Sequence, residues 1–319
     1  MTQILHRFIE TNGIRMHIAE QGRGPLVILL HGFPEIWYSW RHQIGVLADA
    51  GYHVVAPDQR GYGETGSPAE SDKYTQLHLV GDVIGLMDAL GEETAIIVGH
   101  DYGSPVAWNT ARMRPDRIQG VIALSISYIP RGKVSMLKEG IEALGEGFYM
   151  NYYQQLGVAE AEFERDVHET MRKILFGVSE DGKQNEQQLI IPEGHGMLDL
   201  VRDPGVLPDW LTEADLDYYI TAFEKSGFTG AFNWYRAIDK SWEHMAPWSG
   251  AKIITPALFI AGEDDPMVNL PGSREAIANL QQVVSKLEKT MMLPGVGHWT
   301  QQERPAEVTA AMLDFIQNL

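Results

Sequence analysis

Short apolar runs alternate with amphipathic stretches along most of the chain. The apolar runs cover residues 26–30, 52–56, 94–98, 118–126, 252–261 and 286–293. Runs of this length that are apolar on both faces are typical of strands in a buried parallel sheet. The helical patterns cover residues 37–49, 75–90, 105–113 and 305–319. This alternation predicts an α/β fold, with helices on both faces of a mostly parallel central sheet.

Two regions depart from this alternation. Residues 4–22 form two half-alternating segments around Asn12-Gly13, a dipeptide that favours a tight hairpin turn. Residues 130–246 are poor in β-branched runs and rich in aromatic residues. Within them, Thr212 and Asp215 resemble a capping box that opens a helix to about Ser226, and residues 177–210 predict a long loop. We therefore expect a core domain of residues 1–129 and 247–319, with a helical lid (cap) domain of residues 130–246 inserted into it.

Composition narrows the class of protein. The 319 residues include no cysteine, which excludes disulfides, thiolate metal sites and a cysteine nucleophile. Lys and Arg total 25 and Asp and Glu total 43, giving a net charge of −18, which disfavours nucleic acid or an anionic membrane as a partner. The first ten residues lack a secretory pattern, and no apolar run has bilayer-spanning length. The expectation is a soluble cytoplasmic enzyme that acts on a small molecule.

The third apolar run leads into Gly99-His100-Asp101-Tyr102-Gly103, and a helix follows. This is the G-x-S-x-G pattern of a nucleophile elbow with Asp in place of Ser. The exchange matters because a carboxylate that attacks a saturated carbon forms an ester, which water can hydrolyse, whereas a serine would form a stable ether. A helix-capping role alone would not need both glycines. The pattern predicts that Asp101 is a nucleophile in displacement at a saturated carbon, such as opening an epoxide or expelling a halide.

The order of elements places the remaining catalytic groups. The loop His31-Gly32-Phe33-Pro34 follows the first apolar run, so the N–H groups of Phe33 and Tyr102 are the expected oxyanion donors. His298 follows the last predicted strand and has the position of a general base. Asp265 is the expected acid that orients it, with its neighbour Asp264 as the alternative.

A second glycine motif could indicate a nucleotide-binding loop. Residues 61–66 match G-x-G-x-x-G after a strand, but Pro68 and the polar residues behind it do not open a helix. We interpret this segment as a turn-rich loop without a nucleotide role. The histidines show no HExxH motif or close cluster, so we expect no metal and no organic cofactor.

These motifs resemble the soluble epoxide hydrolases of the α/β-hydrolase superfamily, over nearly the whole chain. The matching segments are 31–35, 37–41, 99–103, 297–301, 152–160 and 233–236. The resemblance implies that two lid tyrosines, Tyr152 and Tyr235, donate to the epoxide oxygen, with Tyr153 the alternative if the first match shifts by one residue. A protonated hydroxyl suits this task because its pKa lies near about 10. The side chains expected to contact the substrate are Trp37, Tyr153, Trp234 and Trp299. One departure is Tyr102, where the family more often has Trp.

The predicted reaction is hydrolysis of an epoxide to a vicinal diol through an ester of Asp101, with epoxide and water as the partners and a homo-oligomer as an open possibility. A dehalogenase with the same nucleophile is the first alternative. As the resemblance implies, haloalkane dehalogenases usually place Trp after the Asp and Asn or Glu at the position of Phe33, and fluoroacetate dehalogenases place Arg at the positions of Tyr102 and Pro105. A non-catalytic ligand receptor on the same fold is the second alternative.

Overall fold

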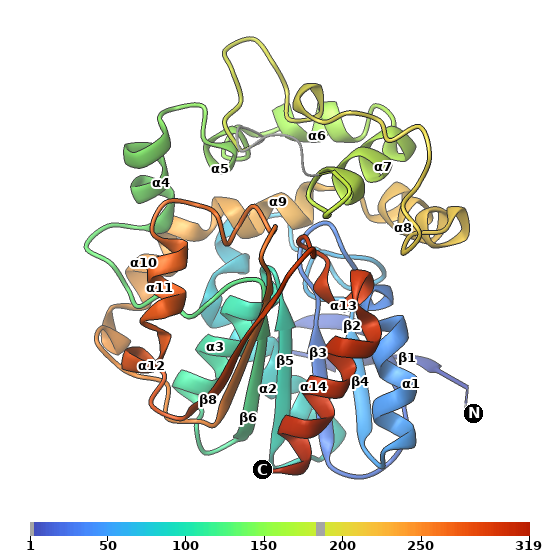
Figure 1. The fold of residues 1–319 in the computed structure, drawn as a ribbon, viewed down its shortest axis with the longest axis vertical. Helices are drawn as coiled ribbons and strands as arrows, with labels where there is room; N and C mark the ends of the chain where they lie inside the picture. The colour runs from blue at the N-terminus through green and yellow to red at the C-terminus, as the bar shows by residue number, and fades with distance from the viewer. Residues whose placement is uncertain (1–2, 183–188) are drawn as a thin grey trace.

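The computed structural model describes residues 3–182 and 189–319. Their strands form one eight-stranded sheet in the order β1-β2-β4-β3-β5-β6-β7-β8 (Figure 1). The strands are β1 (Leu5–Thr11), β2 (Ile14–Gln21), β3 (Leu26–Leu30), β4 (His53–Pro57), β5 (Ala95–His100), β6 (Ile118–Leu124), β7 (Ala257–Gly262) and β8 (Leu287–Leu293). The pairs from β4 through β3 to β8 are parallel, whereas β2 is antiparallel to both β1 and β4. The predicted mostly parallel α/β sheet is confirmed.

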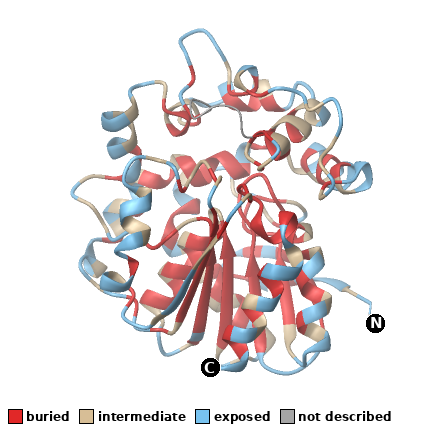
Figure 2. Cartoon of the chain, in the orientation of Figure 1, coloured by how far each residue is buried: buried red, intermediate tan, exposed pale blue. Residues whose placement is uncertain are grey.

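Helices cover both faces of this sheet. On one face, α1 (Arg41–Asp49) and α14 (Pro305–Gln317) pack over a cluster of buried apolar residues that includes Val27 and Leu29 of β3. On the other face, α2 (Gln76–Leu90) and α3 (Gly103–Met113) pack over the second cluster. The strands β2 to β7 are buried along most of their length, whereas the edge strands β1 and β8 are mostly exposed or half-buried, and the helices are buried on their inner sides (Figure 2). Burial on two faces explains why these strands have no polar alternation.

The predicted hairpin turn is present, whereas one predicted helix and one predicted strand begin differently. Asn12 (φ 43°) and Gly13 (φ 77°) form the hairpin turn in the left-handed region, as expected for this dipeptide. The helix expected from residue 37 starts with a 3₁₀ turn, η1 (Trp37–Trp40), before α1. The strand expected from residue 252 begins only at Ala257, because Pro256 has no N–H to donate to a sheet ladder.

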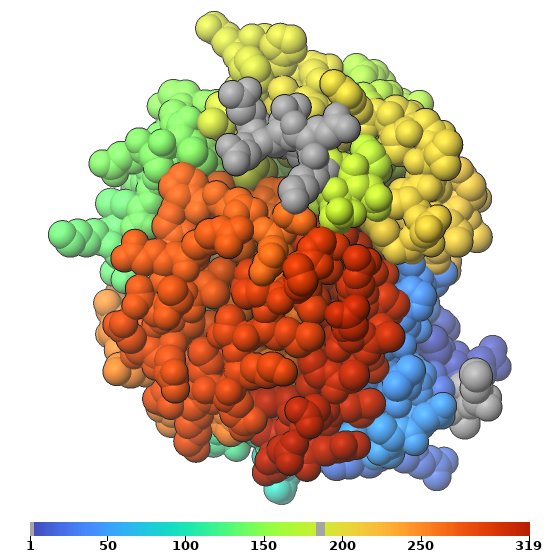
Figure 3. All heavy atoms as spheres, in the orientation of Figure 1, coloured from blue at the N-terminus to red at the C-terminus, as the bar shows by residue number. Residues whose placement is uncertain are grey.

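The segment between β6 and β7 crosses the carboxyl ends of the strands. Its helices are α4 (Met136–Leu144), α5 (Tyr149–Tyr152), α6 (Val158–Phe163), α7 (Val167–Gly177), η3 (Leu198–Leu200), α8 (Glu213–Ser226), α9 (Thr229–Arg236), α10 (Ile238–His244) and η4 (Ala246–Trp248). In space-filling view this lid segment forms the green and yellow upper part of the molecule (Figure 3). The expected loop 177–210 contains only η3 among its described residues, and residues 183–188 lie outside them. The capping box predicted for α8 is present, with Thr212 and Asp215 bonded reciprocally.

Four short helices complete the chain. They are η2 (Ser71–Tyr74), α11 (Ser273–Ala278), α12 (Leu280–Val283) and α13 (Thr300–Glu303). The G-x-G-x-x-G segment forms a turn, in which the Gly61 N–H donates to the Gly66 carbonyl at 3.2 Å, and no helix starts there. A dinucleotide fingerprint needs a helix N-terminus at that point, so the interpretation as a loop is confirmed.

A polar cluster joins the lid segment to the core beside the last helices. Asp215 of α8 accepts from the Tyr38 hydroxyl at 2.9 Å and lies 2.9 Å from Nε of Arg41. The Tyr38 ring stacks on Tyr218 with centroids 4.1 Å apart. Arg41 also donates to Gln302 of α13 at 2.6 Å. These contacts fix α8 against the loop that carries His298.

Replacing Gly103 with Ala tests how tightly the strand-to-helix turn is packed. A Cβ at Gly103 would lie 2.3 Å from the Leu30 carbonyl oxygen and 2.6 Å from that of His31, both of which are backbone atoms of the neighbouring strand end. We expect the free energy of unfolding to fall by about 1–3 kcal/mol, as for other overpacked sites. Gly45 of α1 is the control, because its Cβ would meet nothing closer than 4.0 Å and Ala favours a helix. Urea denaturation in which both variants lose equal stability would contradict this account.

Candidate active site

Asp101 occupies the sharp turn between β5 and α3. Its φ is 49°, a left-handed conformation that is uncommon outside glycine. The turn is too tight for side chains on either side, since a Cβ on Gly99 would lie 2.2 Å from the Gly103 carbonyl oxygen. Such strain is typical of functional positions. The chain therefore holds the carboxylate beyond the end of the strand, at the N-terminus of α3, as the elbow pattern predicts.

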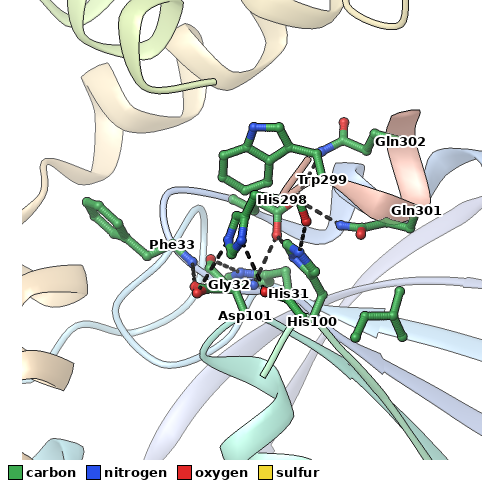
Figure 4. A network of polar contacts seen from close by, with 12 residues as sticks. His31, Gly32, Phe33, His100, Asp101, His298, Trp299, Gln301 and Gln302 are labelled. Atoms are coloured by element: carbon green, nitrogen blue, oxygen red, sulfur yellow. Dashed lines mark hydrogen bonds and ion pairs between the residues drawn. The ribbon is translucent and has the colours of Figure 1, made fainter. Parts of the chain in front are cut away.

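The backbone after β3 contacts this carboxylate directly. The Phe33 N–H donates to Oδ1 of Asp101 at 2.8 Å, and the Phe33 ring points away from it (Figure 4). A Cβ on Gly32 would lie 2.3 Å from the same oxygen, so glycine is required at that position. Tyr102 is the N-cap of α3, where backbone N–H groups have no acceptor within the helix. The Phe33 N–H thus contacts the carboxylate directly, and the oxyanion roles of the Phe33 and Tyr102 N–H groups stay predictions.

His298 lies between two carboxylates. Its Nε2 is 3.5 Å from Oδ2 of Asp101, and its Nδ1 is 3.0 Å from Oδ1 of Asp265. Ser125, which has a φ of 73°, donates to Oδ2 of Asp265 at 2.5 Å. Asp265 is fully buried and also accepts from the Met267 N–H at 2.8 Å, whereas Asp264 is only partly buried. The structure therefore brings Asp265, and not its neighbour, to the histidine.

The electrostatics of these groups are strongly coupled. Burial by itself would lower the pKa of His298, but the charge of Asp265 and the contacts with Asp101 raise it well above the ordinary 6.5. Burial by itself would likewise raise the pKa of Asp101, but its hydrogen bond with His298 and the N–H of Phe33 keep it below the ordinary value. The pKa of His298 is thus raised and that of Asp101 lowered by the same contact between the two side chains.

A buried polar network behind the triad was not predicted from the sequence. Glu35 is fully buried and lies 2.8 Å from Nδ1 of His100, whose Nε2 donates to the His298 carbonyl oxygen at 2.8 Å. The other oxygen of Glu35 accepts from the side chains of Gln301 and Gln302 at 3.1 and 2.9 Å. The network ties the loop after β3, the elbow and α13 together. Glu35 lies in the quoted segment 31–35, but nothing in its spacing indicates burial.

The expectation that Tyr152 donates to the epoxide oxygen is wrong. Its hydroxyl donates to Glu162 of α6 at 2.7 Å, and Glu162 also accepts from the N–H groups of Met197 and Leu198. Burial and the Glu162 hydrogen bond raise the pKa of Tyr152, and the nearby charges that contribute belong to acidic residues of the lid segment. Tyr152 therefore belongs to the interior of the lid segment, because α5 turns it away from the nucleophile.

Two other tyrosines face the nucleophile. Tyr149 and Tyr235 line the same cavity of about 240 Å³ as Asp101, and their ring centroids lie 6.2 Å apart. Burial raises the pKa of both hydroxyls well above 10, and the charge of Asp101 is the next contribution in each case. Both hydroxyls thus remain protonated donors at neutral pH. The position of Tyr235 agrees with its prediction, whereas Tyr149 was missed, although it lies three residues before Tyr152 on the same short helix.

Tyr153, the alternative to Tyr152, packs differently. It is buried between Phe232, at a centroid distance of 4.7 Å, and Tyr235, at 5.0 Å, and it does not line the cavity. The charge of Glu162 affects its pKa more than that of Asp101 does. Tyr153 therefore supports the ring of Tyr235 from behind.

The expectation that three tryptophans contact the substrate is also wrong. Trp37 packs against Tyr218, Trp234 donates to the Arg60 carbonyl at 2.9 Å, and Trp299 donates to the Leu175 carbonyl at 2.7 Å. All three are buried, and none lines the cavity. Their bulk packs the lid segment onto the core, which a sequence pattern does not distinguish from substrate contact.

The described residues also bear on metal binding and on membrane insertion. Across residues 3–182 and 189–319, no three His, Asp or Glu side chains are arranged to hold a metal ion. In the same part of the chain, no helix is both long enough and apolar enough to cross a bilayer.

Comparison with known proteins places this site in a family. A family model for the alpha/beta hydrolase fold matches residues 25–176. The chain is 43% identical to epoxide hydrolase A of Mycobacterium tuberculosis over 98% of this chain and 97% of that protein. It is 44% identical to epoxide hydrolase 3 of Siraitia grosvenorii, over 99% of each chain.

Solved structures agree with these sequence matches. The crystal structure of epoxide hydrolase A from Mycobacterium thermoresistibile superposes with a TM-score of 0.93 at 43% identity, covering 99% of this chain and 98% of that one. An epoxide hydrolase from an endophytic Streptomyces gives a TM-score of 0.94 at 43% identity, covering 98% and 95%. The elbow aspartate, the histidine between carboxylates and the paired tyrosines thus stand in a chain that belongs to the epoxide hydrolase family of the α/β-hydrolase fold.

Proposed function

We propose that the chain hydrolyses epoxides to vicinal diols through an ester of Asp101. The Phe33 N–H holds Oδ1 of Asp101, so Oδ2 is the oxygen free to attack a ring carbon. The new C–O bond forms as the ring C–O bond breaks, and the ring oxygen takes a proton from a tyrosine hydroxyl. The product of this step is a hydroxyalkyl ester of Asp101.

Tyr149 and Tyr235 are the proposed donors to the ring oxygen. Both share the cavity with Asp101, and burial next to a carboxylate keeps their hydroxyls protonated. The departing alkoxide is a poor leaving group in water, so a donor positioned before the reaction lowers the barrier. Two donors from different helices, α5 and α9, also fix the ring for attack from the elbow.

His298 is the proposed general base for hydrolysis of the ester. While Asp101 is ionised, His298 is held as a cation between two carboxylates. Esterification removes the charge of Asp101, which lowers the pKa of His298, so the imidazolium gives up its proton and the tyrosinate left by ring opening is reprotonated. The neutral imidazole can then accept a proton from water and later return it to the departing alkoxide of the diol. That water attacks the Asp101 carbonyl carbon, the Phe33 N–H stabilises the oxyanion, and the diol leaves. Asp265 and Ser125 keep the ring oriented throughout.

The observation that carries this proposal is the row Asp101, His298 and Asp265 opening into a cavity that two tyrosine hydroxyls share. A dehalogenase would use the same ester, but a halide needs N–H donors rather than proton donors. Phe33 offers an apolar ring where the haloalkane enzymes are expected to carry Asn or Glu. A non-catalytic receptor is disfavoured because every group of the two-step scheme is present.

Three expectations from the sequence stay predictions. They are the cytoplasmic location, a homo-oligomer, and the limits of the lid domain at residues 130 and 246.

Replacing His298 with Gln should trap the ester. Alkylation of Asp101 does not need a base, whereas its hydrolysis does, so we expect hydrolysis to slow by about 10³-fold. Intact-mass spectrometry should then show the protein plus one epoxide, and peptide mapping should place the addition on Asp101. Asp101→Asn is the control and should remain unmodified. An H298Q protein that turns over epoxide but never carries the added mass would contradict the covalent route.

Single Tyr→Phe replacements separate the donors from the packing residues. We expect Tyr149→Phe and Tyr235→Phe each to lower kcat/KM by about 10²-fold, as removal of a general acid does. Tyr152→Phe is the matched control, because its hydroxyl bonds to Glu162 inside the lid segment, and it should change kcat/KM little. Steady-state kinetics on styrene oxide would measure this. Loss in Y152F with full activity in Y149F would restore the assignment made from the sequence.

The raised pKa of His298 makes the stability of the protein depend on pH. A group whose pKa is higher in the folded state contributes stability that is present below its unfolded pKa of about 6.5 and is lost as pH rises through the folded value. The wild type should therefore lose stability on alkaline titration, and H298Q should lack that decrease. The groups that face His298 are Asp101, Asp265, His100 and Glu303. Urea denaturation from pH 6 to 10 measures this, and parallel curves for the two proteins would refute it.

A further inference from the structure

Glu303 is a buried acid that neither step of the proposed reaction uses. It is the last residue of α13 and is only 7% exposed. Burial raises the pKa of its carboxyl group, whereas three backbone N–H groups and the charge of His298 oppose that shift. A buried carboxylate is costly unless hydrogen bonds satisfy it, so the position of its partners indicates what the group does.

The carboxylate of Glu303 binds the backbone on both sides of His298. Its Oε2 accepts from the Gly297 N–H at 2.9 Å, and its Oε1 accepts from the Trp299 N–H at 3.0 Å. Both oxygens thus act as acceptors, and hydrogen bonds to an ionised carboxylate are stronger than those between neutral groups. One side chain therefore fixes the two peptide groups between which the imidazole is attached.

The same carboxylate connects the histidine loop, residues 294–299, to the lid segment. Oε2 of Glu303 also accepts from the Glu180 N–H at 3.2 Å, and the His298 N–H donates to the Val178 carbonyl at 2.9 Å. A Cβ on Gly297 would lie 2.3 Å from the Glu180 nitrogen, so glycine is needed for the two backbones to approach this closely. Glu303 is thus the carboxylate at which the histidine loop, α13 and the lid segment meet.

The second half-reaction depends on this support more than the first. Before reaction, the imidazole of His298 has Asp101 at 3.5 Å on one side and Asp265 at 3.0 Å on the other. Once Asp101 is an ester, its charge no longer attracts the ring. A general base must stay within hydrogen-bond reach of the water that it activates, and a small displacement slows the reaction strongly. The backbone of the histidine loop then has to replace the attraction that was lost.

We propose that Glu303 is a positioning residue for ester hydrolysis: its carboxylate fixes the backbone on both sides of His298 and so keeps the imidazole aligned with the attacking water after Asp101 has been alkylated. The inference rests on the proposed epoxide hydrolysis and adds a residue to its second step. Glu303 does not line the cavity, and it neither donates nor accepts a proton in the reaction. The attack of Asp101 on the epoxide does not need it.

Replacing Glu303 with Gln separates the two half-reactions. The amide keeps the length of the side chain, but it has one acceptor oxygen and directs an NH₂ group at a backbone donor. In single turnovers of styrene oxide, acid quenching and intact-mass spectrometry follow the ester as it forms and decays. Ester formation should stay within about twofold of the wild-type rate, because this step needs no base. Ester decay should slow by roughly tenfold, the effect of losing a hydrogen bond to a charged group.

Steady-state kinetics gives a second readout of the same change. When the hydrolytic step slows and ester formation does not, the ester accumulates, so kcat and KM fall together and kcat/KM changes little. A loss of folded protein would instead lower kcat and leave KM unchanged. The pair of constants therefore distinguishes a positioning role from a purely structural one.

Glu162→Gln is the matched control. Glu162 also accepts from two backbone N–H groups, those of Met197 and Leu198, but these partners belong to the lid segment and not to the histidine loop. This replacement removes the same kind of hydrogen bond from a carboxylate of the same length. We expect the rates of ester formation and ester decay to keep their wild-type ratio in E162Q.

Each outcome decides between the two proposals. An E303Q variant that slows ester formation as much as ester decay, or that slows neither, overturns the role of Glu303. If E303Q does not fold, Glu303→Asp keeps the charge but is one methylene shorter, and the same selective slowing of ester decay is expected in it; equal slowing of both steps would again overturn the role. A wild type that never carries an ester during turnover defeats the proposed function itself.

Discussion

The ionic row Asp101, His298 and Asp265 is the interaction on which the rest of this site depends. A buried cation between two carboxylates is stable only while both anions are present, because burial opposes each charge separately. Esterification of Asp101 removes one anion and converts the imidazole from a held cation into a base. The same contacts thus stabilise the resting protein and supply the driving force for the second half-reaction.

The fold brings these groups together from four strand ends, and His298 comes from the loop after β8. The elbow after β5 presents Asp101 in a left-handed conformation, the loop after β3 supplies the Phe33 N–H, and the loop after β7 supplies Asp265. Glu35 and His100 hold the loops in register from behind. The lid segment contributes Tyr149 and Tyr235, which line the same cavity as the carboxylate.

The lid segment also decides what can enter. Its aromatic residues fall into two groups: Tyr149 and Tyr235 face the nucleophile, whereas Tyr153, Trp234 and their neighbours pack the lid segment onto the core. Arg112, near the far end of α3, lines the same cavity.

The sequence by itself determined the sheet, the elbow and the order of the catalytic groups, because short apolar runs, flanking glycines and the positions of Asp101, Asp265 and His298 are local features. Only the tertiary structure decided which lid tyrosine faces Asp101. Tyr149, Tyr152 and Tyr153 lie on or next to one helical turn, and their direction depends on how α5 packs against α6 and α9. It also decided that Glu35 is buried, since burial depends on residues distant in the chain.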